Sequence, residues 1–308
     1  MSTGTGTWLD GALATELPLP DRGLDYGDGL FETLLVQEGS PLYLDFHLQR
    51  LQRGLRALVF PDCLAVAQKQ LLEVSRTLRD RDWHWSVLRL TISRGAGPRG
   101  YAPPASARPR IIITATELDR DCRRMSQGVK LCLATVRCAT QPLLAGIKHL
   151  NRLEQVLAAA ECRPAAADEA VMLDQSGHLV SVTAGNLFLV KGKRLLTPAL
   201  VTSGIAGTRR RLVMEKWAPA AGLSVQESSL TLRDLEAADE VFCSNSVHGV
   251  RPVAYFGERH WDHHPVCEAL FQQYQGDPVS YTHLRAHETR SVIAYAVFCL
   301  KRGGGGGG

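Results

Sequence analysis

The stretch AGIKHLNRLEQVLAAAEC, residues 145–162, places a lysine beside an apolar run and directly before a helical pattern. Apolar residues recur there close to every 3.6 positions, which predicts an amphipathic helix with one core-facing stripe formed by Leu150, Leu153, Val156, Leu157 and Ala160. The lysine is Lys148. An amine beside so much apolar surface loses solvation, and its pKa falls towards values at which it is a nucleophile. The pattern alone leaves a Schiff-base lysine and an ordinary solvated lysine both open.

The last thirty residues do not resemble a protein segment. VSYTHLRAHET (residues 279–289) resembles the translation of a sequencing-library adapter, and AYAVFCL (residues 294–300) resembles the adjoining sequence. The glycines 303–308 resemble the translation of a run of guanine base calls, made after a sequencing read has passed the end of its template. We therefore exclude residues 279–308 from the fold as an adapter scar. A natural tail ending in glycines is the alternative.

Charge and cysteine content exclude several classes of function. The chain has 35 Lys and Arg against 31 Asp and Glu, and the excluded segment holds four of the former and one of the latter. The remainder is thus nearly neutral, which argues against a surface for nucleic acid or membranes. The other cysteines form no CxxC pair and no metal-ligand spacing with histidine, so we expect no metal and reduced thiols. With no signal peptide or long apolar run, we expect a cytoplasmic protein.

The order of elements predicts a mixed α/β protein in two halves with a cleft between them. We expect a small N-terminal α/β domain over residues 1–117, a polar linker over 118–128 and a larger domain over 129–278 that carries Lys148. VKLCLATVRC (residues 129–138) alternates like a strand. Residues 42–44 are expected to form a short strand, and Asp45 is a candidate N-cap for the helix that follows.

Six segments together resemble the fold-type IV pyridoxal-phosphate enzymes, the aminotransferase class IV family. They are GDGLFET (27–33), HLQRL (47–51), SRGAGPRGY (93–101), KHLNRLEQVL (148–157), AGNLFLV (184–190) and GTRR (207–210). They follow the family's order and spacing over about residues 8–271. The resemblance implies a two-domain enzyme with pyridoxal 5'-phosphate in the cleft between the domains.

Two of these segments resemble one branch of the family more than the others. KHLNRLEQVL and SRGxGxRGY are similar to the lyase branch, which converts 4-amino-4-deoxychorismate to p-aminobenzoate and pyruvate for folate synthesis. The resemblance also implies a homodimer. An aminotransferase for D- or branched-chain amino acids remains an alternative, as does a non-catalytic relative that serves as an interaction subunit.

The resemblance implies a set of cofactor residues. Lys148 matches the lysine that forms the Schiff base and then acts as a base. A forked guanidinium suits a phosphate, and backbone amides at a helix start also favour an anion. The positions implied for the phosphate are Arg50, Gly207, Thr208, Arg209 and Ser246.

The substrate residues are less firmly implied. Arg99 aligns with a carboxylate-binding arginine of the D-amino-acid branch, and Tyr101 on the same loop is placed to flank the substrate ring. Arg94 is expected to brace this loop. Thr33 is a candidate proton donor to the leaving enolpyruvyl oxygen, although a threonine in a strand also commonly faces core or solvent. His149 and Asn151 are assigned no catalytic role.

One position departs from the family pattern. Counting back from Asn186, Ser181 occupies the place where the family usually has a glutamate paired with the cofactor's pyridine nitrogen. A carboxylate keeps that nitrogen protonated, whereas a serine offers only a neutral hydrogen bond. We therefore expect a weaker electron sink, which an elimination that forms an aromatic ring tolerates better than amino transfer does.

Overall fold

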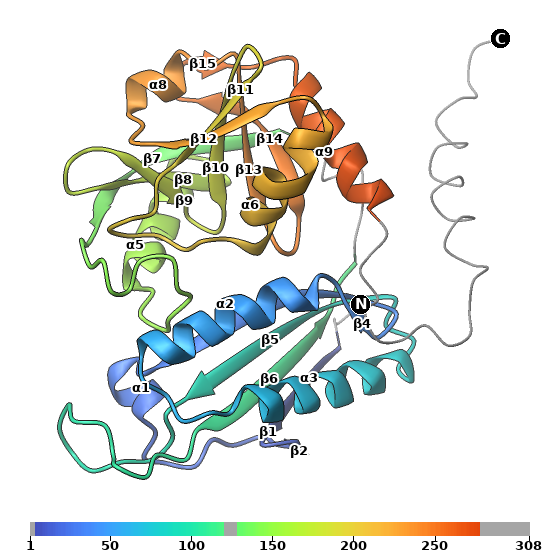
Figure 1. Cartoon of the computed structure of the whole chain (residues 1–308), viewed down its shortest axis with the longest axis vertical. Helices are drawn as coiled ribbons and strands as arrows, with labels where there is room; N and C mark the ends of the chain where they lie inside the picture. Colours follow the sequence, from blue (N-terminus) through green and yellow to red (C-terminus); the bar gives the residue numbers. More distant parts are fainter. Residues whose placement is uncertain (1–3, 120–127, 278–308) are drawn as a thin grey trace.

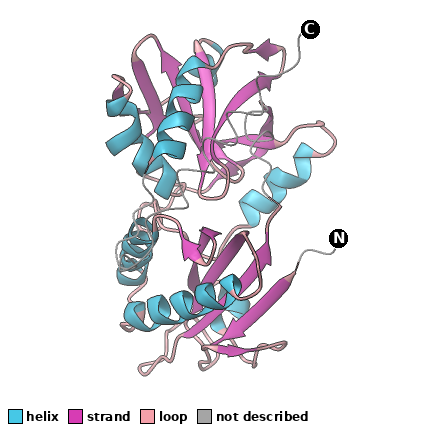
Figure 2. Ribbon diagram, turned by 90° about the vertical axis from the view of Figure 1, so that its right-hand side faces the viewer, coloured by secondary structure: helices cyan, strands magenta, loops and turns pink. Residues whose placement is uncertain are grey.

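The computed structural model describes residues 4–119 and 128–277, which form two β-sheets stacked along the long axis of the molecule (Figure 1). A quarter turn away, the strands lie in an upper and a lower group (Figure 2). The lower group comes from the first part of the chain and the upper group from the second. The fold is thus the mixed α/β arrangement expected from the sequence.

The first sheet is six-stranded and antiparallel, in the order β2-β1-β6-β5-β3-β4. Its strands are β1 (Thr5–Leu9), β2 (Ala12–Leu13), β3 (Gly29–Gln37), β4 (Ser40–Pro41), β5 (Trp85–Ser93) and β6 (Arg110–Glu117). Three helices accompany it: α1 (Arg22–Tyr26), α2 (Leu44–Ala57) and α3 (Leu64–Arg79).

The second sheet is nine-stranded and mixed, in the order β12-β11-β10-β13-β14-β7-β8-β9, with β15 beside β14. Its strands are β7 (Val129–Cys138), β8 (Glu169–Asp174), β9 (Leu179–Val182), β10 (Asn186–Lys191), β11 (Arg194–Pro198), β12 (Ser224–Ser228), β13 (Glu240–Asn245), β14 (Gly249–Phe256) and β15 (Arg259–His260). The helical elements are α5 (Leu153–Cys162), α6 (Thr208–Leu212), the π-helical turn η1 (Val213–Trp217), α7 (Ala218–Ala220), α8 (Leu232–Glu236) and α9 (Pro265–Gly276).

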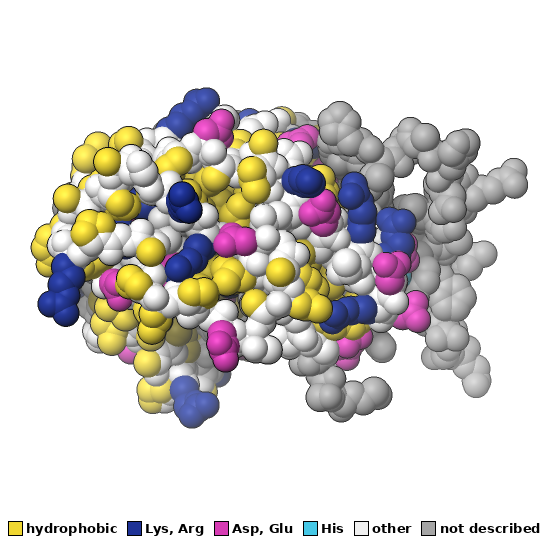
Figure 3. All heavy atoms as spheres, turned by 90° about the horizontal axis from the view of Figure 1, so that it is seen from below, with side chains coloured by type: hydrophobic (Ala, Val, Ile, Leu, Met, Phe, Trp, Pro, Cys, Tyr) yellow, Lys and Arg dark blue, Asp and Glu magenta, His cyan; other side chains and the backbone are white. Residues whose placement is uncertain are grey.

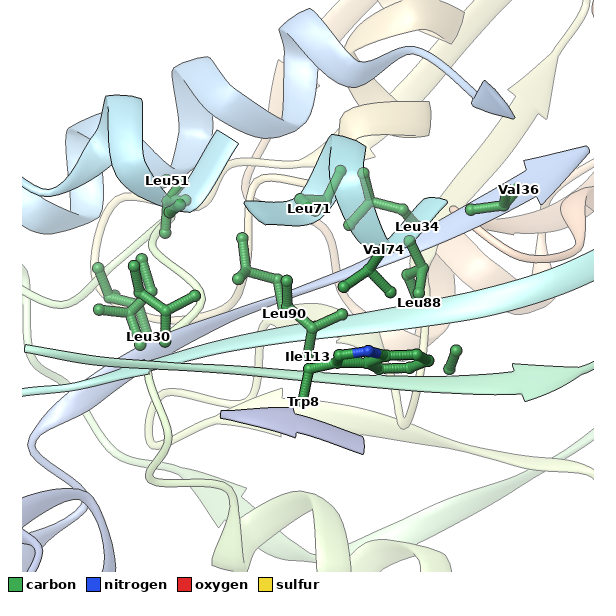
Figure 4. Packing of buried hydrophobic residues seen from close by; sticks show 14 of the residues in the cluster. Trp8, Leu30, Leu34, Val36, Leu51, Leu71, Val74, Leu88, Leu90 and Ile113 are labelled. Carbon is green, nitrogen blue, oxygen red and sulfur yellow. The ribbon is translucent and has the colours of Figure 1, made fainter. Parts of the chain in front are cut away.

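Helices α2 and α3 cover one face of the first sheet (Figure 4). Side chains alternate across a strand, so Leu88 and Leu90 of β5 point to the same face. There they meet Leu51 of α2 and Leu71 and Val74 of α3. Burial of this apolar surface is the main stabilising contribution of the first half of the chain.

A second core joins the two halves. Leu42 and Tyr43, which precede α2, are buried among side chains of η1 and α9, including Trp217 and Tyr274. Asp277 accepts hydrogen bonds from the Tyr43 hydroxyl at 3.2 Å and from Trp217 Nε1 at 3.1 Å. The halves therefore share buried contacts as well as lying next to each other.

Two local predictions about the first helix are wrong. Residues 42–44 do not form a strand, because β4 ends at Pro41 and α2 begins at Leu44. Asp45 lies inside the first turn of α2, and the N-cap is Tyr43, whose φ of 56° is left-handed. The buried aromatic contacts of Tyr43 override the local preference for a polar cap.

The strand predicted over residues 129–138 is confirmed as β7, but the core-facing stripe of the next helix is wrong. The α5 residues Leu153, Val156 and Leu157 are 78%, 60% and 56% exposed. The helix instead packs through its small residues Ala158 and Cys162. Periodicity identified an amphipathic helix, yet the side of α5 that meets the sheet is set by close packing.

Two predictions fall on parts of the chain that the structure does not describe. Most of the proposed linker, residues 120–127, and the proposed adapter scar, residues 279–308, lie outside the described residues. The division into domains at this linker therefore stays a prediction, although the first sheet ends at Glu117 and the second begins at Val129.

No helix among residues 4–119 and 128–277 is long and apolar enough to cross a membrane. The end of the molecule formed by its first half carries basic and acidic side chains interspersed among apolar ones (Figure 3). This face therefore lacks an extended patch of one charge, as the near-neutral composition predicts.

Helix α3 allows a matched test of the first core, because Leu71 is fully buried whereas Val66 on the same helix is 52% exposed. Leu71→Ala removes buried methyl groups and leaves a cavity, so we expect it to lower the free energy of unfolding by ~3 kcal/mol. Val66→Ala should change it by less than ~0.5 kcal/mol. Urea denaturation measures both, and equal losses would contradict the described packing.

Candidate active site

A cavity of about 410 Å³ lies where the two halves meet. The first half contributes Phe31, Thr33 and Arg50 to its wall. The second contributes, among others, Lys148, Arg152, Ser181, Asn186, Gly207, Thr208, Ser244 and Ser246. Its volume is in the range of small-molecule sites.

The backbone around Lys148 is held by both halves of the chain. The Lys148 carbonyl accepts the N–H of Phe31 at 2.9 Å, which places this segment along the start of β3. Two residues earlier, the N–H of Gly146 donates to Gly204 at 3.0 Å and its carbonyl accepts from Ala206 at 3.1 Å. Lys148 thus sits in a bridging segment, and α5 begins only at Leu153 rather than directly after it.

The Lys148 amine is poorly solvated, as the sequence predicts. Its Nζ lies 4.1 Å from the centre of the Phe31 ring. Burial lowers the pKa of Lys148 to about 7, and the nearby Arg50 charge acts in the same direction. Near neutral pH a large share of these amines is therefore unprotonated and nucleophilic, since an ordinary lysine has a pKa of about 10.4.

A buried carboxylate fixes Arg50. Glu32 on β3 is 1% exposed and accepts hydrogen bonds from Arg50 Nε at 2.8 Å and Nη2 at 2.5 Å, a bidentate pair. Arg50 Nη1 donates to the Ala206 carbonyl at 3.1 Å. Burial alone raises the pKa of Glu32, but the Arg50 charge and the hydrogen bonds from Arg50 and His47 outweigh it and lower that pKa to about 2.

His47 extends this network to the second half. Burial lowers the pKa of His47 to about 4, so its ring is neutral at pH 7. Nδ1 must then donate to Glu32, whose oxygen lies 2.7 Å away, because an ionised carboxylate only accepts. The other nitrogen, Nε2, is left to accept from the Thr208 hydroxyl at 3.4 Å.

The start of α6 forms the part of the cavity wall next to Arg50, whose Nη1 donates to the carbonyl of the preceding Ala206. Gly207 is its N-cap, and α6 continues without interruption into η1 and α7. A side chain at Gly207 would collide with Asn186, whose Oδ1 lies 2.0 Å from the place of a Cβ. Asn186 in turn donates to the Ile205 carbonyl at 2.8 Å. Glycine is thus required here for the close approach of backbone and side chain.

The side chains of Arg209 and Ser246 make contacts within the protein, and the roles of these residues at the phosphate stay predictions. The Arg209 guanidinium stacks 4.2 Å above Tyr43 and donates to the Ser246 carbonyl at 3.2 Å, and its side chain does not line the cavity. The Ser246 hydroxyl lines the cavity but donates to the Thr33 carbonyl at 2.7 Å. Nearby, the Ser244 hydroxyl lines the same cavity, is buried, and has no hydrogen-bond partner among the described residues.

Ser181 lies on β9 and lines the cavity. The wall formed by the described residues contains Arg50, Lys148 and Arg152 but no Asp or Glu. The assignment of Ser181 to the position that faces the cofactor's pyridine nitrogen stays a prediction.

The loop with Arg99 and Tyr101 is not brought to this cavity. Tyr101 is 88% exposed, and its ring packs edge-on against Tyr26 at 5.7 Å. Arg22 donates to the carbonyls of residues 100 and 101, which anchors the loop. Arg94 binds Asp28 and the carbonyls of residues 58 and 59, so it braces the loop stem. The substrate roles of Arg99 and Tyr101 stay predictions.

The sequence did not identify four residues that shape the site: Glu32, His47, Arg152 and Ser244. Glu32 and His47 lie inside the segments GDGLFET and HLQRL, so their position in those segments was the available signal. Their pairing depends on β3 and α2 lying side by side, which no local pattern predicts.

Replacing Glu32 tests the buried ion pair. Because the pKa of Glu32 is lower in the folded protein than the usual 4.5, its carboxylate stabilises the fold above about pH 4.5, and this contribution is lost as the pH falls towards 2. Glu32→Gln leaves Arg50 without its counter-charge and should cost ~3 kcal/mol in the free energy of unfolding at pH 7. The difference in the free energy of unfolding between Glu32→Gln and the unaltered protein should become smaller as the pH is lowered from 4.5 to 3.

Glu73→Gln is the matched control, since Glu73 forms only an exposed pair with Lys69 on α3. It should change the unfolding free energy by less than ~1 kcal/mol at any of these pH values. A pH-independent loss in Glu32→Gln would contradict the assignment of an ionised Glu32.

Comparison with known proteins places this geometry in a family. Residues 29–256 match the family described as amino-transferase class IV. The chain is 38% identical over 252 residues to aminodeoxychorismate lyase of Vibrio harveyi, covering 80% of this chain and 90% of that protein. It is 33% identical over 234 residues to a putative branched-chain-amino-acid aminotransferase of Methanocaldococcus jannaschii, covering 76% and 80%.

The fold agrees with the sequence comparison. The crystal structure of 4-amino-4-deoxychorismate lyase from Pseudomonas aeruginosa superposes with a TM-score of 0.83 at 42% identity, covering 88% of this chain and 99% of that one. The matched region contains both β3 and the Lys148 segment, which together form the cavity. This chain belongs to the amino-transferase class IV family.

Proposed function

We propose that this protein is a pyridoxal-phosphate-dependent lyase that converts 4-amino-4-deoxychorismate to p-aminobenzoate and pyruvate. The observation that carries the proposal is the Lys148 amine, with a pKa of about 7, in the wall of the cavity between the halves. The two lyases named above have higher identities to this chain than the putative aminotransferase.

The residues present fit pyridoxal phosphate. The cofactor requires an amine for its aldehyde and donors for its phosphate. Lys148 supplies the amine, while Arg50, the start of α6 at Gly207–Thr208 and the unpartnered Ser244 hydroxyl supply donors around one cavity. We propose Ser244 as the phosphate hydroxyl beside Ser246, because the Ser246 hydrogen is already donated to Thr33.

When bound, pyridoxal phosphate supplies an electron sink for the carbon next to the substrate amine. Lys148 Nζ, unprotonated in part near neutral pH, is the base that takes the proton from that carbon. The Thr33 hydroxyl is the proposed proton donor to the enolpyruvyl oxygen as pyruvate leaves. Ser246 fixes Thr33 through its backbone carbonyl, and Phe31 shields one side of the Lys148 amine from water.

The charge of the cavity suits this substrate. A phosphate and two carboxylates must be accommodated, and the described wall contains the guanidinium groups of Arg50 and Arg152 and the partly protonated amine of Lys148, with no Asp or Glu. A surface of one sign raises the local concentration of anions of opposite charge. A neutral amino acid substrate would have less need of such a wall.

The proposal includes a cytoplasmic homodimer. The six described cysteines, Cys63, Cys132, Cys138, Cys162, Cys243 and Cys267, are free thiols, in keeping with a reducing compartment. Leu143 and the α5 side chains Leu153, Val156 and Leu157 are exposed. Exposed apolar groups of this kind mark protein interaction sites, which supports pairing with a second copy.

Lys148→Ala tests the chemistry. The purified protein is loaded with pyridoxal phosphate and given 4-amino-4-deoxychorismate without any amino acceptor, and p-aminobenzoate and pyruvate are quantified. We expect equal amounts of both products from the unaltered protein and at least a ~100-fold lower rate from Lys148→Ala, since a base contributes that much. Lys130→Ala, an exposed lysine on β7, is the control and should keep the rate.

Normal turnover by Lys148→Ala would refute the proposed base. Products that form only when an amino acceptor is added would favour the aminotransferase alternative. Binding of the cofactor without any turnover would favour the non-catalytic relative.

Ser181→Glu tests the weaker electron sink. A charged hydrogen bond at the pyridine nitrogen is stronger than a neutral one by roughly 1.4 kcal/mol, a factor of about ten. We therefore expect the ratio of amino transfer to lyase turnover to rise about tenfold, measured with D- and branched-chain amino acids beside 4-amino-4-deoxychorismate. Ser176→Glu in the exposed turn between β8 and β9 is the control. An unchanged ratio would eliminate the hypothesis.

A further inference from the structure

A second cavity of about 280 Å³ adjoins the first. Arg152, Gln155 and Gly204 line both, so the two spaces meet at these residues. Its remaining wall comes from the segments on either side of Lys148, which include His149 and Glu154, and from the loop before α6.

The Arg152 side chain at this junction has no carboxylate partner. None of the ion pairs among the described residues includes Arg152, and its buried Nε has no hydrogen-bond partner there. Its Nη2 donates to His149 Nε2 at 2.5 Å. Burial, and next the Arg152 charge, lower the pKa of His149 to about 4, so this partner is neutral at pH 7. A guanidinium stays protonated and retains its full charge.

Among the described residues the other polar groups of the junction form no ion pair with Arg152, although the charge of Glu154 acts on it. Gln155 Oε1 is also buried without a partner. Glu154 is the acidic residue in the wall of the second cavity, and its Oε1 accepts the backbone N–H of Ala139 at 2.9 Å. Buried donors and charges are nearly always paired in proteins, which points to a ligand that brings an anionic acceptor.

We propose that Arg152, where the two cavities meet, binds a carboxylate of the substrate, and that the second cavity receives the part of the substrate bearing it. This inference rests on the proposed function, since 4-amino-4-deoxychorismate carries one carboxylate on the ring and one on the enolpyruvyl group. A guanidinium binds a planar carboxylate through two parallel hydrogen bonds. Arg152 lines both cavities, whereas Arg99, for which the sequence suggested a carboxylate-binding role, lines neither, and that role of Arg99 stays a prediction.

The experiment compares Arg152→Met and Arg152→Lys with Arg163→Met in the holoenzyme. Arg163 is exposed at the other end of α5, so its replacement removes the same charge from the same helix without touching either cavity. The measurements are kcat and KM for 4-amino-4-deoxychorismate and the dissociation constant of chorismate, which carries the same two carboxylates. Thermal melting and cofactor absorbance verify that each variant is folded and loaded.

Loss of a charge-assisted hydrogen bond should raise KM and the chorismate dissociation constant about 10- to 100-fold in Arg152→Met, with kcat changed less than about threefold. The KM and the chorismate dissociation constant of Arg152→Lys should lie between those of Arg152→Met and the unaltered protein. Lysine keeps the positive charge but cannot form two parallel hydrogen bonds to a carboxylate. Inhibition by p-aminobenzoate and by pyruvate identifies the carboxylate: the product whose inhibition weakens in Arg152→Met carried it. Arg163→Met should match the unaltered protein.

Unchanged KM and chorismate binding in a folded Arg152→Met would overturn the inference. A change in Arg152→Met that is confined to the pH dependence of kcat would also overturn the inference, because Arg152 would then act through Lys148. A change confined to the oligomeric state would overturn it as well. If the unaltered protein forms no p-aminobenzoate, the proposed function fails instead, and chorismate binding still decides the carboxylate site.

Discussion

The site depends on a closed circuit of hydrogen bonds that passes through both halves of the chain. Glu32 holds Arg50, Arg50 donates to Ala206, and Ala206 donates to Gly146, two residues before Lys148. The Lys148 carbonyl accepts from Phe31, the neighbour of Glu32, which closes the circuit. Such a ring holds the Lys148 segment at a fixed position relative to Arg50 and the start of α6.

The same circuit determines the charge of the cavity. Side chains alternate along β3, so Glu32 points to α2 while Phe31 and Thr33 point to the cavity. The Glu32 carboxylate therefore accepts its hydrogen bonds from Arg50 and His47 behind the cavity wall and does not face the cavity. The guanidinium groups of Arg50 and Arg152 remain in the wall, where they add to the effect of burial in lowering the pKa of Lys148 and attract anions.

Much of this arrangement could be predicted from the sequence, because short segments carry it. The family resemblance identified the segments that hold Lys148, Arg50 and the start of α6, and Ser181 was located by counting back from Asn186. Other features depend on contacts between distant segments. The outward face of α5 was mispredicted because small side chains, not the apolar stripe, pack on the sheet. Glu32 and Arg152 lie in matched segments, but their roles depend on what lies opposite them, which the segments do not reveal.

The absence of a carboxylate from the described cavity wall links the substrate to the chemistry. A glutamate at the place of Ser181 would strengthen the electron sink but would also put a negative charge beside a cavity that must accept a dianionic substrate and a phosphate. Amino transfer needs that sink in both half-reactions, whereas elimination of pyruvate gains aromatic stabilisation in its product. In the proposed lyase, a neutral Ser181 would weaken the electron sink, which elimination tolerates better than amino transfer does, and would preserve the attraction of the wall for anions.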